Sequence, residues 1–489
     1  MMEQWKKGHK VLMTANTGAG KTYFVMNTLY QMCLTKNYRV LFLTNRVSLR
    51  DQLKTLYGKQ SEDVVKIMNY QSFINYIKFM PHKIEGIYTL IIADECHYFF
   101  SDSTFANETD LPLNYLIENT ENQLVIFLSA TSQILQEYFQ KQNEYKINFN
   151  YQFLKPYRFN QCFYWDDIEV IHKFLIELPK GEKAIFFCKS LKQAYQLHKE
   201  LPDNSAFICS QGNPKYGDLC DVNILEQIRT KERFDKQILF TTNVIENGIN
   251  INDPQLKHII TDIYNFDTIV QCIGRKRIAE CDELPNIYIK QIKQAYIQTY
   301  INNINNKMKP LECFYKRSNA EFNKQYSQKN KFGLLYTVSV EDNENLSKYV
   351  VNRAKEMKFN YDLLIANKIN KIDTKFGHLK HLCKCMNIDI SKFRDLSMLY
   401  AAVNIQDKLD HFLEKPLYGE DKKLFIELLQ KNVLRPLQGG YKIDTVNRYF
   451  ANIQLPYYIT EKKQGNRNKD NYGRRAWILH KTESKTKIA

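Results

Sequence analysis

The sequence is poor in the residues and segments that mark several special classes of protein. It has only 17 glycines and 12 prolines in 489 residues, which excludes a low-complexity chain. Its 11 cysteines are scattered and odd in number, a pattern typical of reduced thiols and not of a disulfide framework. No run approaches the roughly 18 apolar residues of a membrane span, and Met1–Lys10 forms no apolar leader. We therefore expect a cytoplasmic, intracellular protein.

The chain is instead rich in apolar and basic residues. Hydrophobic residues make up 44% of it and aromatic residues 13%, enough to fill the cores of the roughly three domains that its length predicts. Lys and Arg number 69 against 53 Asp and Glu, which leaves a net charge of +16. This excess of positive charge favours a polyanionic partner, such as nucleic acid or an acidic membrane surface.

Short apolar runs alternate with helical patterns along most of the first two thirds of the chain. This alternation predicts an α/β fold with parallel sheets and crossover helices. Ser190, for example, is placed to cap a helix whose Ala194 and Leu197 fall on one side, between two of the apolar runs. The candidate strands are Lys10–Thr14, Arg39–Thr44, Tyr88–Asp94, Leu124–Ser129, Lys183–Cys188, Ser205–Cys209, Gln237–Thr241, Lys257–Asp262 and Asn286–Ile289.

Two interruptions of this alternation suggest domain boundaries. One lies near Leu154–Asp167, where Pro156 stands in a polar, aromatic stretch, and the other lies near Lys290–Lys309. We therefore expect three domains, over residues 1–155, 156–295 and 296–489. The third is predicted to be mostly helical, with helices at Asn345–Met357, Leu396–Glu414 and Glu420–Leu434.

The end of the chain has a finer pattern. A helix is expected at Ile443–Asn452, followed by two strands at Tyr457–Glu461 and Ala476–His480 with a basic turn between them. This layout fits a winged helix, and it fits equally well any other α+β end domain with a hairpin. From Glu461 onward nine basic residues stand against three acidic ones, which is consistent with a surface that contacts phosphates.

The strongest single motif lies between the first strand and the helix that begins near Thr22. It matches G-x-x-x-x-G-K-[ST] except that Ala15 stands at the first glycine. Glycines let consecutive N–H groups face one anion, while the helix N-terminus adds partial positive charge. Lys21 would bridge the β- and γ-phosphates, and the Thr22 hydroxyl would ligate Mg²⁺. The predicted nucleotide contacts are Ala15, Asn16, Thr17, Gly18, Ala19, Gly20, Lys21 and Thr22.

Two carboxylates at the end of another strand complete a predicted hydrolase site. Asp94 can hold the metal, and Glu95 can orient and deprotonate the attacking water. Cys96-His97 follows directly, and such a pair could instead ligate a metal or supply a nucleophile, although no second pair stands at suitable spacing.

The order of these motifs, followed by Ser129-Ala130-Thr131, resembles the nucleotide-binding half of a superfamily 2 helicase of the DExH group. The Ser-Ala-Thr element couples the nucleotide site to nucleic acid in that family, which gives Ser129 and Thr131 this role. Thr44-Asn45-Arg46 and Tyr70-Gln71-Ser72 resemble its strand-contacting motifs, so Thr44, Arg46 and Gln71 become candidate contacts to nucleic acid. Gln4 and Trp5 are candidates for adenine contact, although Trp5 fits equally well as a packing residue.

The second half of the resemblance, which ends near Lys290, has its own motifs. Thr241–Asn250 resembles motif V, which touches both the nucleic-acid backbone and the nucleotide, and Gln271–Arg277 resembles motif VI, Q-x-x-G-R-x-x-R. The resemblance assigns nucleic-acid contact or coupling to Lys189, Thr241, Thr242 and Gln271, and nucleotide contact to Gly248 and Asn250.

An arginine of motif VI reaches the γ-phosphate in the family, and Arg275 is the predicted finger here. A guanidinium suits this task because its planar fork can hold two of the oxygens on which charge grows during transfer. The sequence departs from the motif at the second arginine, since Arg277 arrives one residue early and Ile278 stands where the family has arginine. Arg277 is therefore a second candidate for the finger, although its place in the motif is not assigned.

The resemblance implies two RecA-like domains in tandem, with ATP and Mg²⁺ between them and a nucleic-acid strand across them. The implied activity is ATP hydrolysis that drives translocation along nucleic acid or its unwinding, with DNA slightly favoured over RNA and no membrane partner. The alternative is a P-loop ATPase that uses ATP as a switch to assemble or remodel a complex without unwinding. Replication, repair, mobile-element maintenance and defence stay open as pathways, as does the oligomeric state.

Overall fold

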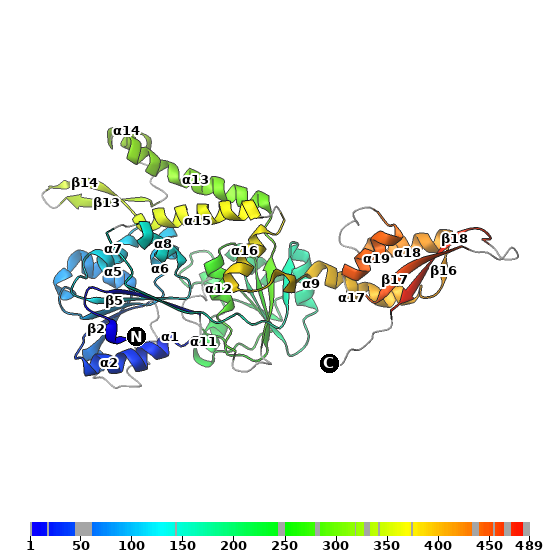
Figure 1. Ribbon diagram of the computed structural model, residues 1–489, viewed down its shortest axis with the longest axis horizontal. Helices are drawn as coiled ribbons and strands as arrows, with labels where there is room; N and C mark the ends of the chain where they lie inside the picture. Colours follow the sequence, from blue (N-terminus) through cyan, green and yellow to red (C-terminus); the bar gives the residue numbers. More distant parts are fainter. Residues whose placement is uncertain are drawn as a thin grey trace. The chain divides into compact units, whose positions relative to one another are not determined.

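The computed structural model describes residues 2–16, 19–44, 61–141, 144–242, 250–278, 284–317, 319–326, 333–340, 343–372, 375–432, 440–452, 455–463 and 471–482 (Figure 1). The chain divides into two compact units, which are described separately. The first comprises Met1–Arg158, Lys183–Leu284 and Gln291–Ile390, and the second comprises Phe159–Glu182, Pro285–Lys290 and Ser391–Ala489.

The first unit begins with a six-stranded parallel sheet in the order β3-β2-β4-β5-β1-β6. Its strands are β1 (Lys10–Ala15), β2 (Val40–Leu43), β3 (Val65–Met68), β4 (Leu90–Ala93), β5 (Leu124–Ser129) and β6 (Phe149–Phe153). Every residue of β1, β2, β4 and β5 is buried, as expected for strands that are covered on both faces. These are the four strands that the sequence predicts for this region, whereas β3 and β6 are partly exposed and were not predicted.

Helices cover both faces of this first sheet. The helical segment after β1 consists of α1 (Lys21–Tyr23), the π-helix η2 (Phe24–Leu29) and α2 (Tyr30–Thr35), and its Val25 and Leu29 pack with Val11 and Met13 of β1. Leu12 packs into the other core, with α5 (Tyr70–Phe79), α6 (Tyr98–Ser101), α7 (Asp110–Glu118) and α8 (Gln133–Lys141). The remaining short helices are η1 (Met2–Gln4), α4 (Ser61–Val64), η3 (Pro81–Lys83) and η4 (Asp102–Thr104).

The second half of this unit contains the parallel strands β11-β8-β10-β9. They are β8 (Lys183–Phe187), β9 (Ser205–Phe207), β10 (Ile238–Thr241) and β11 (Leu256–Thr261), with helices α10 (Leu191–Glu200), α11 (Val222–Lys231) and α12 (Phe266–Ile273) and the short η5 (Gly217–Leu219). All four strands were predicted. The predicted cap is confirmed, because the Ser190 hydroxyl accepts a hydrogen bond from the Gln193 N–H at 3.3 Å.

A further segment, residues 291–390, packs on both of these α/β lobes. It contains α13 (Gln294–Lys316), α14 (Asn319–Tyr326), the antiparallel strands β13 (Leu335–Val340) and β14 (Asn343–Val351), α15 (Arg353–Ile372) and α16 (Gly377–Met386). Ala354 and Met357 of α15 are buried in the core of the first lobe. His378 of α16 stacks on Tyr264 and Phe266 of the second lobe, with ring centroids 5.2 and 4.7 Å apart. Figure 1 shows α15 running below α13 and above the first sheet.

The expected helix at Asn345–Met357 is wrong in its first half. Residues 343–351 form β14, paired with β13, and the helix begins only at Arg353. The run Tyr349-Val350-Val351 suits a strand because two of its residues are β-branched. Pairing with a strand eight residues upstream decides the conformation, and a local helical pattern cannot reveal such pairing.

The second unit holds the parallel strands β15-β7-β12, which are β7 (Cys162–Trp165), β12 (Asn286–Lys290) and β15 (Phe393–Asp395). It also contains α9 (Ile168–Ile176), α17 (Leu396–Asp410), α18 (Gly419–Asn432), α19 (Ile443–Asn452) and the antiparallel sheet β16-β18-β17, with η8 (Ile390–Lys392) at its border. The strands of that sheet are β16 (Pro416–Leu417), β17 (Tyr457–Lys463) and β18 (Arg475–Lys481). The predicted helix at Ile443–Asn452 and the hairpin after it are confirmed.

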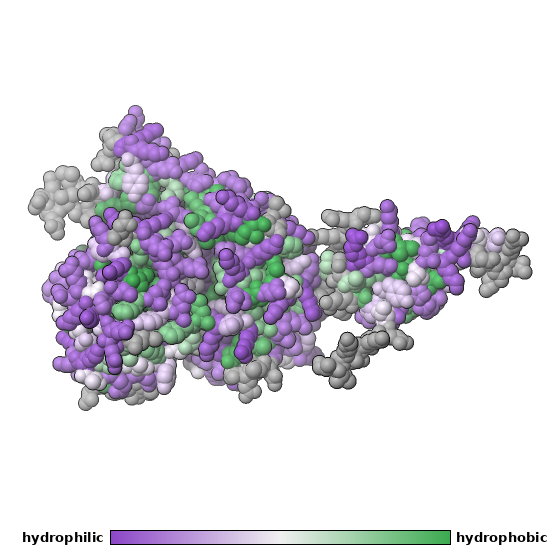
Figure 2. Space-filling model, in the orientation of Figure 1, coloured by the Kyte–Doolittle hydropathy of each residue, from purple (hydrophilic) through white to green (hydrophobic). Residues whose placement is uncertain are grey.

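The predicted α/β class with parallel sheets is thus confirmed, and the C-terminal part is only partly helical. The domain boundaries at residues 155 and 295 stay a prediction. Across the described ranges, none of the helices combines the length and the apolar character that crossing a bilayer requires. Hydrophilic residues cover most of the face that Figure 2 shows, as expected when the apolar residues fill cores.

Candidate functional site

The turn after β1 has the geometry of an anion-binding loop. Gly20, directly before α1, has φ +88°, a left-handed conformation that favours glycine. The Ala19 N–H donates to the Asn16 carbonyl at 3.0 Å, and the Asn16 side-chain oxygen accepts from the Lys155 N–H at 2.7 Å. The second contact ties the turn to the chain that leaves β6. Thr17 and Gly18 lie outside the described residues.

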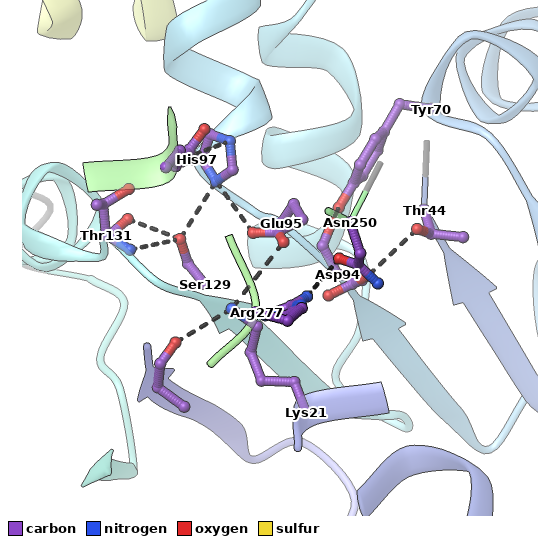
Figure 3. A network of polar contacts seen from close by, with 12 residues as sticks. Lys21, Thr44, Tyr70, Asp94, Glu95, His97, Ser129, Thr131, Asn250 and Arg277 are labelled. Atoms are coloured by element: carbon purple, nitrogen blue, oxygen red, sulfur yellow. Dashed lines mark hydrogen bonds and ion pairs between the residues drawn. The ribbon is translucent and has the colours of Figure 1, made fainter. Parts of the chain in front are cut away.

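Lys21 lies at the start of the helical segment, where a phosphate-binding lysine is expected. Its Nζ donates to the Ala15 carbonyl at 3.1 Å and lies 3.9 Å from Glu95 Oε1. Both side chains are mostly buried, so these contacts hold the ammonium inside the site (Figure 3). Thr22 lies in α1, and its side chain is outside the described part of the structure.

Asp94 and Glu95 follow β4 directly, at the same end of the sheet as the turn. Asp94 is 4% exposed, and its Oδ2 accepts a hydrogen bond from the Thr44 hydroxyl at 3.2 Å. The Tyr70 hydroxyl donates to the Asp94 carbonyl at 2.7 Å. Burial raises the pKa of Tyr70 well above its usual value, so the hydroxyl stays a proton donor. The buried carboxylate is therefore fixed through both its side chain and its backbone.

The backbone of Glu95 is strained. Its φ of +49° is uncommon for any residue other than glycine, and such conformations gather at functional sites. The conformation places the carboxylate between Lys21 and His97, since its Oε2 lies 3.5 Å from His97 Nδ1. Burial raises the pKa of the neighbouring Cys96 thiol, which keeps it protonated and speaks against the alternative of a nucleophile there. Among the described residues, no three His, Cys, Asp or Glu side chains are grouped so that they could hold a metal ion.

His97 joins the acidic pair to two other parts of the fold. Its Nδ1 lies 3.3 Å from the Ser129 hydroxyl, and its Nε2 accepts a hydrogen bond from the Gln271 side-chain amide at 2.9 Å. Gln271 belongs to α12 of the second lobe, so this contact bridges the two lobes inside the first unit. Ser129 in turn accepts from the Thr131 N–H at 3.0 Å and donates to the Thr131 carbonyl at 2.8 Å. The Ser-Ala-Thr turn is thereby connected to the acidic pair.

Both motif VI arginines lie beside one short bridge in the second lobe. The Arg277 N–H donates to the Ile251 carbonyl at 2.8 Å, and the Ile251 N–H donates to the Arg275 carbonyl at the same distance. The Arg277 guanidinium donates to Asn250 Oδ1 at 2.5 Å, and Figure 3 shows both side chains in the same close-up as Lys21, Asp94 and Glu95. Arg275 is 3% exposed.

The described residues predicted to contact or couple to nucleic acid form an exposed group and a buried group, with the half-buried Thr131 between them. Gln71, in the first turn of α5, and Lys189, after β8, are exposed and can touch a partner directly. The buried group is Thr44, Ser129, Thr241, Thr242 and Gln271, of which Thr44, Ser129 and Gln271 make the contacts described above. Arg46 and Gly248 lie outside the described residues. The buried residues have little surface with which to touch a partner, so coupling is the part of their predicted role that stays compatible with their burial.

Several contacts of the site have no signal in the sequence. The Tyr70 bond to Asp94, the Asn16 bond to Lys155 and a 2.5 Å bond between the Thr14 and Ser132 hydroxyls each join residues that are far apart in the chain. Trp5 is 5% exposed, and its indole N–H donates to the Tyr151 hydroxyl at 3.3 Å. The packing alternative for Trp5 is therefore the one that the structure supports.

Two family models match the chain, in the order of its two lobes. The type III restriction enzyme res subunit matches residues 1–134, and the helicase conserved C-terminal domain matches residues 166–278. Together they span about half of the sequence and include the motifs of the site. The chain belongs to the superfamily 2 helicases. No curated protein matches it.

Three solved structures are similar to part of the chain. Mss116p bound to ssRNA and AMP-PNP is 14% identical over 58% of this chain and 66% of that one, with a TM-score of 0.42. A fragment described as an HsdR subunit of a type I restriction enzyme from Vibrio vulnificus YJ016 is 19% identical over 59% and 60%, with a TM-score of 0.40. The helicase Lhr of Mycobacterium smegmatis bound to ssDNA and AMP-PNP is 14% identical over 60% and 45%, with a TM-score of 0.42. The matches thus span between 45% and 66% of those chains.

The left-handed turn at Gly20 can be tested against a glycine elsewhere with the same conformation. Gly181 has φ +89° and, like Gly20, has no atom within 4 Å of an added Cβ. Gly20→Ala and Gly181→Ala should each cost roughly 1–2 kcal/mol of unfolding free energy, because both force alanine into the left-handed region. Only Gly20→Ala should also weaken binding of a fluorescent nucleoside triphosphate, measured by anisotropy. Equal triphosphate affinity in both variants would contradict an anion-binding role for the turn.

Proposed function

We propose that the chain is an ATP-dependent nucleic-acid translocase or helicase, with DNA slightly favoured over RNA as the strand it moves along. One observation carries the proposal. A chain of close contacts, Lys21 to Glu95, Glu95 to His97 and His97 to Gln271, runs from the phosphate turn of one lobe to a helix of the other. A triphosphate bound at Lys21 would therefore act directly on the contact between the lobes.

Triphosphate binding would begin at the turn after β1. The N–H groups near Gly20 and the start of the helical segment offer donors and partial positive charge to the phosphate oxygens. Lys21 would exchange its present acceptors, the Ala15 carbonyl and the Glu95 carboxylate, for the β- and γ-phosphates. Glu95 is then released from the ammonium and can accept a proton.

Asp94 and Thr22 would hold Mg²⁺, which neutralises charge on the phosphates when it is bound. A carboxylate at a strand end fits this ion, since Mg²⁺ prefers hard oxygen ligands and takes few of them from the protein. The Thr44 and Tyr70 contacts keep Asp94 in place before the ion arrives. Glu95, one residue further on, would orient the attacking water and take its proton.

The second lobe would supply the guanidinium that stabilises charge on the γ-phosphate. Arg277 is supported for this role by the bond that holds its guanidinium at Asn250, and Figure 3 draws both side chains together with Lys21, Asp94 and Glu95. Arg275, the finger that the sequence predicts, is almost fully buried, and we therefore rank it after Arg277. Either arginine would draw the lobes together only while the γ-phosphate is present.

Hydrolysis would reach the nucleic acid through His97 and the Ser129–Thr131 turn. His97 contacts Glu95, Ser129 and Gln271 at once. A change at Glu95 would therefore pass through His97 to both Ser129 and Gln271. The exposed Gln71 and Lys189 lie on different lobes and would grip the strand alternately as the lobes open and close. Directional movement follows from such alternation.

Glu95→Gln should lower kcat for ATP hydrolysis by about 10²–10⁴-fold while ATP still binds, because an amide cannot accept the proton. Lys21→Ala should abolish turnover and weaken ATP binding, since the phosphate contact itself is lost. Phosphate release, measured with and without single-stranded DNA or RNA, gives the readout, and Glu85→Gln on the exposed surface is the control. Stimulation by nucleic acid is expected for the wild type, whereas unstimulated turnover would favour the ATP-switch alternative.

The two arginines can be separated by their kinetic effects. Arg277→Ala should lower kcat by about 10²–10³-fold with little change in KM, the loss expected when a group that stabilises only the transition state is removed. Arg275→Ala should lower the melting temperature together with kcat, because it leaves a cavity beside the Ile251 bridge. Normal turnover by Arg277→Ala, with a folded but inactive Arg275→Ala, would transfer the finger role to Arg275.

A further inference from the structure

A groove of about 670 Å³ lies between the first lobe and the β13–β14 hairpin, outside the triphosphate site. Gln71 and Asn75 of α5 and Asn107 border it on one side, together with Tyr98 of α6. Tyr336 and Tyr349 border it from the hairpin. Figure 1 shows the hairpin above α5 and α7, next to the segment that leads into α15.

The aromatic rings around the groove are held in place by other contacts. Tyr98 stacks on Tyr70, with ring centroids 4.4 Å apart and planes 8° apart. Tyr349 packs edge-on against Phe322 at 5.3 Å, and the Tyr336 hydroxyl donates to Asp110 Oδ2 at 3.3 Å. Rings that are already fixed lose little conformational entropy when a ligand binds to them.

The polar groups of the groove are neutral amides. Gln71, Asn75 and Asn107 are exposed, and each amide offers both a donor and an acceptor. Glu108 is the one ionisable carboxylate among the bordering residues, and it is paired with Lys78 at 2.8 Å. A groove of amides and tyrosines suits a planar, neutral heterocycle, which stacks on rings and pairs with amides along its edge. None of the described residues that border the groove is a lysine or arginine, so the groove as described suits a neutral group better than a phosphate.

We propose that this groove receives one base of a bound single strand, turned out of the stack of its neighbours. The inference rests on the proposed function and names a base-reading subsite for it. Gln71 lies both in the groove and in the predicted strand-contacting motif. Residues 316–358, which include the hairpin, carry nine basic and five acidic side chains, a balance that favours a phosphate backbone nearby.

The subsite is also connected to the hydrolytic site. Tyr98 stacks on Tyr70, and the Tyr70 hydroxyl holds the carbonyl of Asp94. Tyr98 borders the groove although it is 2% exposed, so the groove is two contacts away from the residue that would hold the metal. Seating a base should affect ATP turnover as well as strand affinity.

The test uses the full chain and compares strands that differ only in whether they carry bases, or only in their sugar. The probes are fluorescent oligodeoxyuridylate, oligouridylate and a deoxyribose-phosphate strand of equal length that carries abasic sites. Tyr349→Ala and Asn75→Ala should weaken binding of the strands with bases by roughly 5- to 150-fold and by severalfold, respectively, and leave affinity for the abasic strand unchanged. Tyr349→Phe should bind as the wild type does, since it keeps the ring. Tyr315→Ala, an exposed tyrosine of α13, is the matched control.

The outcomes separate this inference from the function on which it rests. Equal losses for the abasic strand and the strands with bases, or no loss in either groove variant, overturn the base subsite while leaving the translocase proposal intact. Absence of nucleic-acid binding by the wild type overturns both. A loss confined to the deoxyuridylate or the uridylate strand supports the subsite and identifies the sugar of the strand that it serves, because these two strands carry the same base.

Discussion

The hydrogen bond from Gln271 to His97 is the constraint on which the site depends. It is buried, it joins residues 174 positions apart, and it connects the second lobe to the histidine that contacts the acidic pair. A neutral hydrogen bond contributes only about 0.5–1.5 kcal/mol in net terms, but each buried partner left unsatisfied costs about 1–3 kcal/mol. Loss of this bond would leave two buried polar groups unsatisfied, which favours the arrangement of the lobes in which Gln271 meets the network of Lys21, Glu95 and His97.

The rest of the site is arranged so that little must move when the triphosphate arrives. Asp94 is fixed by Thr44 and by Tyr70, while Glu95 keeps a left-handed backbone that only its surroundings can sustain. Lys21 is the side chain that would change partners, from the Ala15 carbonyl and the Glu95 carboxylate to the phosphates. Positions that are prepared in this way reduce the reorganisation that the reaction requires. Tyr70 also connects these fixed side chains to the groove beside the hairpin, because its ring stacks on Tyr98.

Sequence patterns predicted the elements of this fold well wherever the signal was local. The nine expected strands are present, since each is an apolar run buried on both faces, and the turn with Gly20 and Lys21 stands where its motif placed it. The helix expected over Asn345–Met357 failed because its first half pairs with β13, a contact that no local pattern contains. The edge strand β6 was missed for a related reason, since its alternating exposure resembles a loop.

The candidate site shows the same limit. Its residue types could be named from motifs, but the roles of Thr44 and Tyr70 as supports of Asp94 required coordinates. The groove combines α5 with a hairpin more than 250 residues away, so no spacing within the sequence could have indicated it.

The central claim is that the second lobe governs hydrolysis through Gln271 and His97. A double-mutant cycle with His97→Ala, Gln271→Ala and the combined variant, measured as kcat for nucleic-acid-stimulated ATP hydrolysis, tests it most directly. The account predicts strong coupling, with the combined variant no slower than the slower single variant, and a coupling energy of about 1–3 kcal/mol. Effects that simply add would mean that the two residues act independently, and would contradict the account.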